Sequence, residues 1–146
     1  MGTRSQTAVF DGADKLVQIY RQFDGYPSGH GKDLAEFMKG LKLVNGMGMS
    51  DTQRIANGAG CFAAQLVAHL KKGPGHIYLE APSQDLLQHD YTYVIGLDTF
   101  APEKGIGIVV YAGDRQIFKG KVPAFAKFCA KDDEALEGPG TFALPL

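Results

Sequence analysis

Hydrophobic and polar residues alternate over several segments of this chain, as expected for β-strands that bury one face. The alternation is clearest over 15–23, where Gln18 and Tyr20 share one face and Val17 and Ile19 share the other. A turn signal, Asp-Gly-Ala-Asp, precedes this segment and predicts a hairpin. The segments predicted to be strands are 3–10, 15–23, 75–79, 91–97, 105–111 and 116–119.

Two other segments have the spacing of amphipathic helices. Leu34, Phe37, Met38 and Leu41 form one apolar stripe, and Gly40 weakens or ends this helix. A second helix is expected over 61–72, which stops at a Lys-Lys-Gly-Pro sequence. Pro123 indicates the first turn of a short terminal helix. We interpret 42–60 as irregular and 137–146 as an extended tail.

The expected order is strand-strand-helix-helix-strand-strand-strand-strand-helix. Strands follow one another instead of alternating with helices, which favours an α+β fold with a mainly antiparallel sheet and the helices packed on one face. A doubly wound nucleotide-binding fold is disfavoured. The 146 residues contain no internal repeat or linker, so we expect a single domain over 1–146.

Composition and charge restrict the partners. The 15 basic and 16 acidic residues are scattered along the chain, which disfavours general nucleic-acid binding. No apolar run is long enough to span a bilayer, and the polar N-terminus lacks the apolar core of a signal peptide. The two cysteines have no metal-ligand spacing and are expected to be reduced, so we expect a cytoplasmic protein.

The best candidate for chemistry is the segment from Asp24 to Gly31, between a strand and a helix. Backbone amides at a helix start bind anions, and glycines allow a ligand to approach the backbone. A pocket for a phosphorylated or nucleotide-like ligand is one interpretation. A tight connection with a solvated histidine is the other. The candidate ligand-binding residues here are Arg21, Asp24, Tyr26, Ser28, Gly29, His30 and Gly31.

Further candidates lie outside this segment. Arg4, just before the first strand, either binds a phosphate or is a solvated charge. Asn57 either forms hydrogen bonds with the polar edge of a ligand or adopts a left-handed turn. Cys61 at a helix start is either a reactive thiol or buried. The histidines lack zinc-motif spacing, so we expect neither a metal nor a cofactor.

Several segments resemble a family of small uncharacterised proteins from bacteria and their phages. They are Gly-Thr-Arg-Ser at 2–5, the segment 20–31, the segment 57–69 and Gly-Pro-Gly at 73–75. The likeness covers about the first 95 residues. The resemblance implies a stand-alone cytoplasmic domain, often carried on mobile or viral genomes, and it implies no particular activity.

Three functions follow from these expectations. The leading one is a non-enzymatic module that binds a small phosphorylated or nucleotide-like molecule, which in a phage setting would sequester a signalling nucleotide. The second is a hydrolase or phosphodiesterase with His30 as acid–base and Asp24 as base or metal ligand. The third is a protein inhibitor or assembly subunit that acts through an exposed strand edge and the Gly/Pro-rich tail. A homo-oligomer is expected, with an apolar strand such as Ile106–Tyr111 pairing across a two-fold axis.

Overall fold

A computed structural model describes residues 2–46 and 54–137 and has the predicted α+β fold. Strands and helices occur in the expected order, and all six predicted strands join one sheet. The sheet strands are β1 Ser5–Asp11, β2 Asp14–Arg21, β5 Ile77–Glu80, β6 Tyr91–Leu97, β7 Gly107–Ala112 and β8 Arg115–Lys121. The remaining elements are η1 Pro27–Gly31, α1 Lys32–Met38, β3 Lys42–Val44, β4 Ile55–Asn57, α2 Gly58–Leu70, η2 Pro102–Lys104 and α3 Val122–Glu137.

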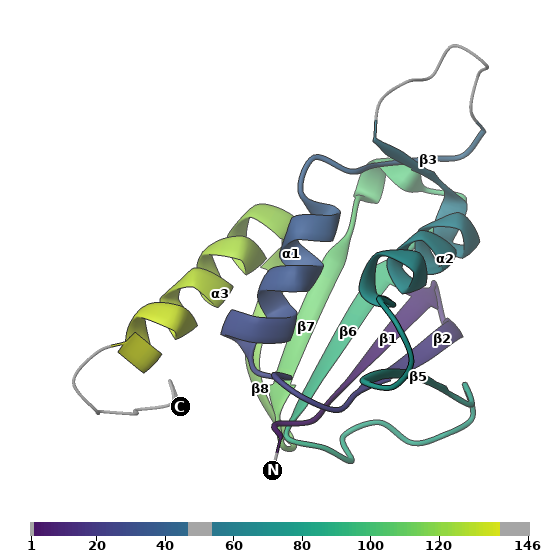
Figure 1. Cartoon of the computed structure of the whole chain (residues 1–146). Coiled ribbons are helices and arrows are strands. Elements are labelled where there is room, and N and C mark those ends of the chain that lie inside the picture. The colour runs from purple at the N-terminus through teal and green to yellow at the C-terminus, as the bar shows by residue number, and fades with distance from the viewer. Residues whose placement is uncertain (1, 47–53, 138–146) are drawn as a thin grey trace.

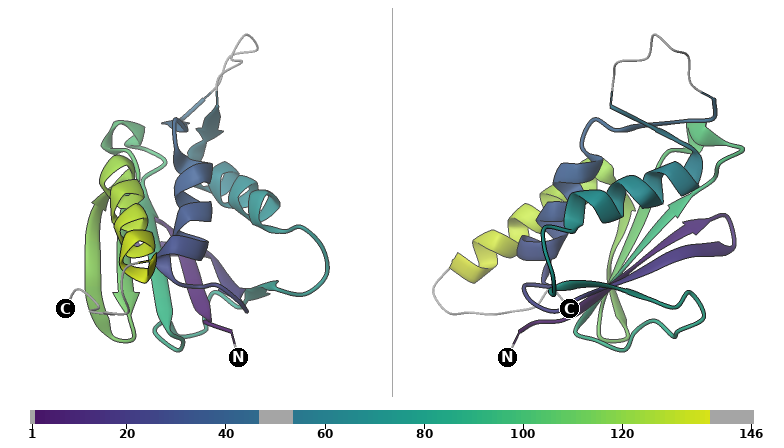
Figure 2. Two further views of the ribbon diagram at one scale, coloured as in Figure 1. Left: turned by 60° about the vertical axis from the view of Figure 1, so that its left-hand side comes forward. Right: turned by 45° about the vertical axis from the view of Figure 1, so that its right-hand side comes forward.

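The sheet has the order β5-β2-β1-β6-β7-β8 and is antiparallel except between β1 and β6, which run parallel. The three α-helices lie on one face of it (Figures 1 and 2). Strand β7 lies inside the sheet, between β6 and β8. The expectation that Ile106–Tyr111 pairs with a second copy is therefore wrong in its choice of strand, because the edges of this sheet are β5 and β8. Whether the protein forms an oligomer stays a prediction.

Two further differences concern the segment predicted to be irregular. Residues 42–44 and 55–57 form β3 and β4, a two-stranded parallel sheet of its own. Helix α2 begins at Gly58, three residues earlier than expected. Outside this segment, Gly40, whose φ is 72°, follows the end of α1 as predicted. The predicted tail, residues 137–146, lies outside the described residues from 138 onward.

The core fills the space between the helices and the sheet. Alternate strand residues such as Val9, Ile19 and Ile95 are at most 1% exposed, and they pack against Leu34 and Leu66 of the helices. The neighbours in sequence of the core-facing residues point to the other face of the sheet. There Gln6 and Gln18 are also buried, and both amides donate to Glu80 Oε1 at 2.9 Å. Burial of polar groups on that face is possible because each amide has a partner.

Candidate functional site

The predicted segment 24–31 lies at the end of the sheet where β1 and β6 begin. Its chain leaves β2, makes the π-helical turn η1 and continues into α1. Arg21, at the end of β2, organises the region. Its Nε donates to Phe23 O at 2.6 Å, and its Nη1 donates to Asp33 Oδ2 at 2.6 Å and to His30 Nδ1 at 3.2 Å.

His30 is the centre of a buried hydrogen-bond chain. Because a guanidinium can only donate, His30 Nδ1 must accept from Arg21, and the ring proton is assigned to Nε2. Nε2 then donates to Thr7 Oγ1 at 2.6 Å. Burial, and next the charges of Arg21 and His76, hold the pKa of His30 well below its usual value. His30 is therefore neutral at pH 7. We call Thr7, Arg21, His30 and Asp33 the Arg21 network.

The glycines of this segment let the protein pack against itself. A Cβ on Gly29 would lie 2.4 Å from Asp24 O, and one on Gly31 would lie 2.7 Å from Cys129 Sγ. A Cβ on Gly25 would lie 2.8 Å from Arg4 C and 2.9 Å from Ser5 N, and the Gly25 N–H donates to Thr3 O at 2.8 Å. The space that these glycines leave open is occupied by protein atoms.

The other predicted residues of the segment lie at its surface. Asp24 is exposed with a φ of 57°, and the Tyr26 hydroxyl donates to its Oδ1 at 3.1 Å. Ser28 is half-buried within η1. Asp24 and the buried His30 are linked through the backbone, since His30 N–H donates to Asp24 O at 2.8 Å. Acid–base catalysis by this pair has little geometric support, because His30 is 1% exposed and its ring nitrogens are both bonded.

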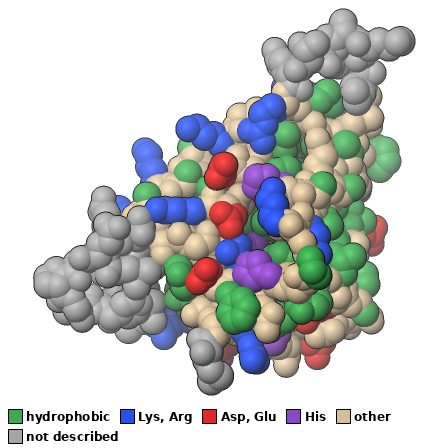
Figure 3. Space-filling model, viewed as in Figure 1, with side chains coloured by type: hydrophobic (Ala, Val, Ile, Leu, Met, Phe, Trp, Pro, Cys, Tyr) green, Lys and Arg blue, Asp and Glu red, His purple; other side chains and the backbone are tan. Residues whose placement is uncertain are grey.

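Two residues that the sequence did not indicate join this region. Asp33 forms an ion pair with Arg21. His76, whose φ is 68°, stacks its ring on the ring of Phe23, and the two ring centroids are 5.8 Å apart. Among the described residues, His76 Nδ1 is a buried atom with no hydrogen-bond partner. Burial and then Arg21 lower the pKa of His76. The only sequence signal for His76 is the preceding Gly-Pro-Gly turn. Basic, acidic and histidine side chains are close together on this face (Figure 3).

Among the described residues, the side chains of Arg4 and Asn57 are not bonded to the other predicted residues, although the Arg4 backbone lies against Gly25. Arg4 is exposed and lines a polar hollow of about 460 Å³ with Gly2 and residues 88–90. Asn57 lies at the start of α2, near the other end of the sheet, where its Oδ1 accepts the Gly46 N–H at 2.7 Å. Cys61, the alternative nucleophile, is exposed, and its Sγ lies 3.4 Å from Gln65 Oε1 on its own helix.

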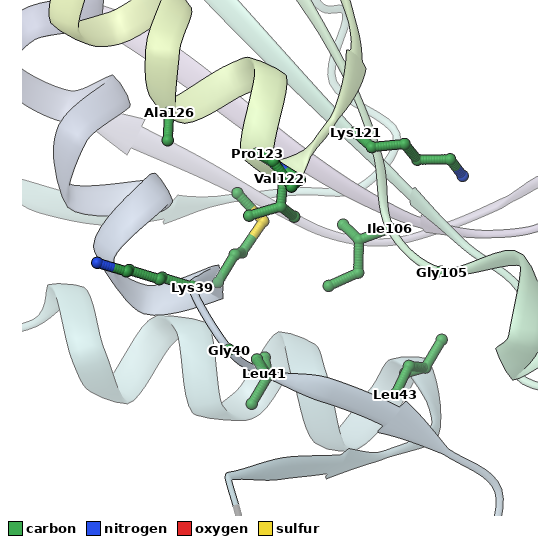
Figure 4. A pocket seen from close by; sticks show the side chains of 11 residues that line it. Lys39, Gly40, Leu41, Leu43, Gly105, Ile106, Lys121, Val122, Pro123 and Ala126 are labelled. Carbon is green, nitrogen blue, oxygen red and sulfur yellow. The ribbon is translucent and has the colours of Figure 1, made fainter.

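A cavity of about 550 Å³ lies at the opposite end of the sheet, where β7 begins and β8 ends. Leu41, Leu43, Ile106 and Val122 face one another across it (Figure 4). They come from three separate parts of the fold. We call it the α1–α3 cavity; its lining is Met38, Lys39, Gly40, Leu41, Leu43, Gly105, Ile106, Lys121, Val122, Pro123 and Ala126.

Few of the described side chains around this cavity carry polar or titratable groups. Lys39 and Lys121 extend away from it, so that only their aliphatic stems contribute to its walls (Figure 4). Lys121 Nζ donates to Lys104 O at 2.6 Å. Arg54 bonds the carbonyls of Phe37 and Lys39, which fixes the C-terminal end of α1 against the chain entering β4. The cavity is thus an apolar space with cations outside its mouth.

No group of three histidine, cysteine, aspartate or glutamate side chains that could hold a metal occurs in the described part of the chain. Within the same residues, none of the helices has both the length and the apolar character needed to cross a membrane. No protein-family model, curated protein or solved structure matches this chain.

Proposed function

We propose that this protein is a non-catalytic binding module that holds the apolar part of a small molecule in the α1–α3 cavity. The observation that carries the proposal is the cavity itself. Its volume of about 550 Å³ falls within the range of small-molecule sites, roughly 300–1,000 Å³, and such sites are lined mainly by hydrophobic side chains. Four aliphatic side chains that face one another meet this description.

The segment 24–31 has weaker support as the ligand site. Its cation, Arg21, already bonds a carbonyl, a carboxylate and a histidine within the protein. Nearby, Lys71 donates to Gly75 O and Ile77 O. Because these charges hold the fold together, an added phosphate would have to compete with internal partners. The cavity needs no such rearrangement.

The test is an NMR titration of the backbone amides with a panel of octanol, indole, nucleotides and cyclic dinucleotides. We expect saturable shifts confined to 38–43, 105–106 and 122–126 for at least one compound with an apolar body. Shifts confined instead to 21–33, or none that saturate across the panel, would overturn the proposal.

A blocking variant makes the test specific. Ala126 is exposed and lies on the cavity side of α3, so Ala126→Phe places a ring in the cavity without disturbing the core. We expect it to abolish the saturable shifts. Ala124→Phe is the matched control, because Ala124 is exposed on the same helix and does not line the cavity. Equal binding by the two variants would place the ligand elsewhere.

A further inference from the structure

The connection between β5 and β6 (Figure 1) consists of residues 81–90, which we call the strap. All of its residues are exposed except Leu86 and His89, which are half-buried. None of them belongs to the hydrophobic core of the described chain. The ring of His89 contacts the ring of Tyr20, and the two centroids are 4.9 Å apart. The hydrophobic effect therefore contributes little to holding the strap on the sheet.

Side chains of the outer face of the sheet, opposite the helices, hold the middle of the strap. Gln6 Nε2 and Gln18 Nε2 both donate to Asp85 O, at 3.1 and 3.3 Å. The Gln88 N–H donates to Gln6 Oε1 at 3.0 Å. Each of these bonds has a side chain as one partner, unlike the backbone ladders that join the strands. Because a side chain can rotate and exchange its partner for water, such bonds open more readily than a ladder.

Glu80, the last residue of β5, orients these side chains. Its Oε1 accepts from Gln6 Nε2 and Gln18 Nε2, both at 2.9 Å, and its Oε2 accepts from Gln84 Nε2 of the strap at 2.9 Å. Lys15 Nζ adds a bond to Gln84 O at 3.0 Å. Hydrogen bonds to a charged carboxylate are stronger than those between neutral groups, so we expect Glu80 to contribute most to the closed strap.

Polar groups stay buried on this face while the strap is closed. Gln6, Gln18 and Thr92 are all 0% exposed. Thr92 is next to Gln6 in the register of β1 with β6, and its Oγ1 has no hydrogen-bond partner among the described residues. A buried hydroxyl without a partner is costly, and water that enters as the strap opens can supply the missing bond. Opening therefore hydrates polar groups and exposes little apolar surface.

We infer that the strap is a conformational gate: it opens as one unit while the six-stranded sheet stays folded, and Glu80 holds it closed. In the closed form the carboxamides of Gln6 and Gln18 bond the backbone of the strap, and in the open form they face solvent. The strap shares no residue with the described lining of the α1–α3 cavity, so this inference does not depend on the proposed function.

Native-state hydrogen exchange of the full chain, measured by NMR at urea concentrations below the unfolding transition, tests the inference. The reporter is the Gln88 N–H, and the reference is the Ile95 N–H in β6, a strand that is paired on both sides. We expect the protection of Gln88 to be at least about a hundredfold lower than that of Ile95 and to be independent of urea, because local opening exposes little surface. The side-chain amide protons of Gln6 and Gln18 should have the same protection as the Gln88 N–H.

A Glu80→Gln variant identifies the group that holds the strap. It weakens bonds that exist only in the closed form, so the protection of Gln88 should fall about tenfold. A substitution whose effect is the same in the closed and open forms would lower the protection of Ile95 and leave that of Gln88 unchanged. Glu36→Gln is the matched control, because it removes the same charge from an exposed residue of α1, and it should change neither.

Three results would contradict the inference. If Gln88 and Ile95 have the same protection and the same urea dependence, the strap opens only when the whole protein unfolds. If the Gln88 N–H is not protected at all, the closed form is not populated. If Glu36→Gln lowers the protection of Gln88 as much as Glu80→Gln does, Glu80 does not hold the strap closed.

Discussion

The two ends of the sheet fill their space in opposite ways. At the end that carries 24–31, glycines bring backbone within contact of backbone, and the side chains of the Arg21 network are bonded to one another. At the other end, aliphatic side chains stop short of each other and leave the α1–α3 cavity. The polar and titratable side chains at the first end thus stabilise the fold, and aliphatic residues at the other end line the cavity that we propose binds a ligand.

Helix α1 connects these two ends. It begins immediately after η1, where Asp33 is bonded to Arg21, and it ends at Met38, which lines the cavity. The close packing at the first end therefore fixes the position of one wall at the second. Under the proposed function, the glycine-rich segment would contribute to ligand binding without direct contact, by supporting α1.

Replacing a glycine at the closely packed end should cause the largest loss of stability. In Gly29→Ala the added methyl would lie 2.4 Å from Asp24 O, so backbone must move, and we expect a loss of about 3 kcal/mol in the free energy of unfolding in urea. Gly60→Ala is the control: it lies in α2, is exposed, and its Cβ would meet nothing within 4 Å. It should stabilise the protein by about 0.5–1 kcal/mol. A cost below about 1 kcal/mol for Gly29→Ala would contradict the close packing.

The buried histidine predicts a pH dependence of stability. The pKa of His30 is lowered in the folded state, so below its unfolded value near 6.5 the unfolded chain binds a proton that the folded chain does not. Stability is therefore fully present above about pH 6.5 and falls as the pH decreases, by up to about 1.4 kcal/mol per pH unit from this group.

Urea unfolding of the wild type and of His30→Gln between pH 7.5 and 5 measures this contribution. The variant lacks the titrating ring, so its stability should decline less steeply over this interval, whatever its stability at pH 7.5. His76, whose pKa is also lowered, remains in both proteins and contributes equally. If the stabilities of the two proteins fall in parallel as the pH decreases, the pKa of His30 is not lowered in the folded protein.

Much of the fold could be predicted from the sequence because its signals are local. Alternation over 15–23 and helical spacing from Leu34 are properties of a few consecutive residues, and both segments form the expected elements. The parallel pairing of β1 with β6 joins segments more than 80 residues apart and leaves no local pattern. Strands β3 and β4 have three residues each, too few for alternation to identify them.

The candidate site was harder to predict because it depends on the directions in which its side chains point. The closeness of Arg21 and His30 follows from their sequence separation, but their inward direction depends on Thr7 and Asp33, which the fold brings to them. The α1–α3 cavity has no sequence signal. Leu43, Ile106 and Val122 look like any core residues, and only the tertiary arrangement leaves space between them.

Filling that space should have the smallest effect on stability. Ala126 and Ala124 are both exposed on α3, and a phenylalanine at an exposed helical position costs roughly 0.5 kcal/mol of helix propensity. At 126 the ring is covered by the cavity walls, and partial burial of its apolar surface offsets this cost by about 1 kcal/mol. We therefore expect Ala126→Phe to match the wild type within about 0.5 kcal/mol and to exceed Ala124→Phe in urea unfolding. If the two variants lose the same stability, no open apolar space adjoins residue 126, and the contrast between the two ends of the sheet disappears.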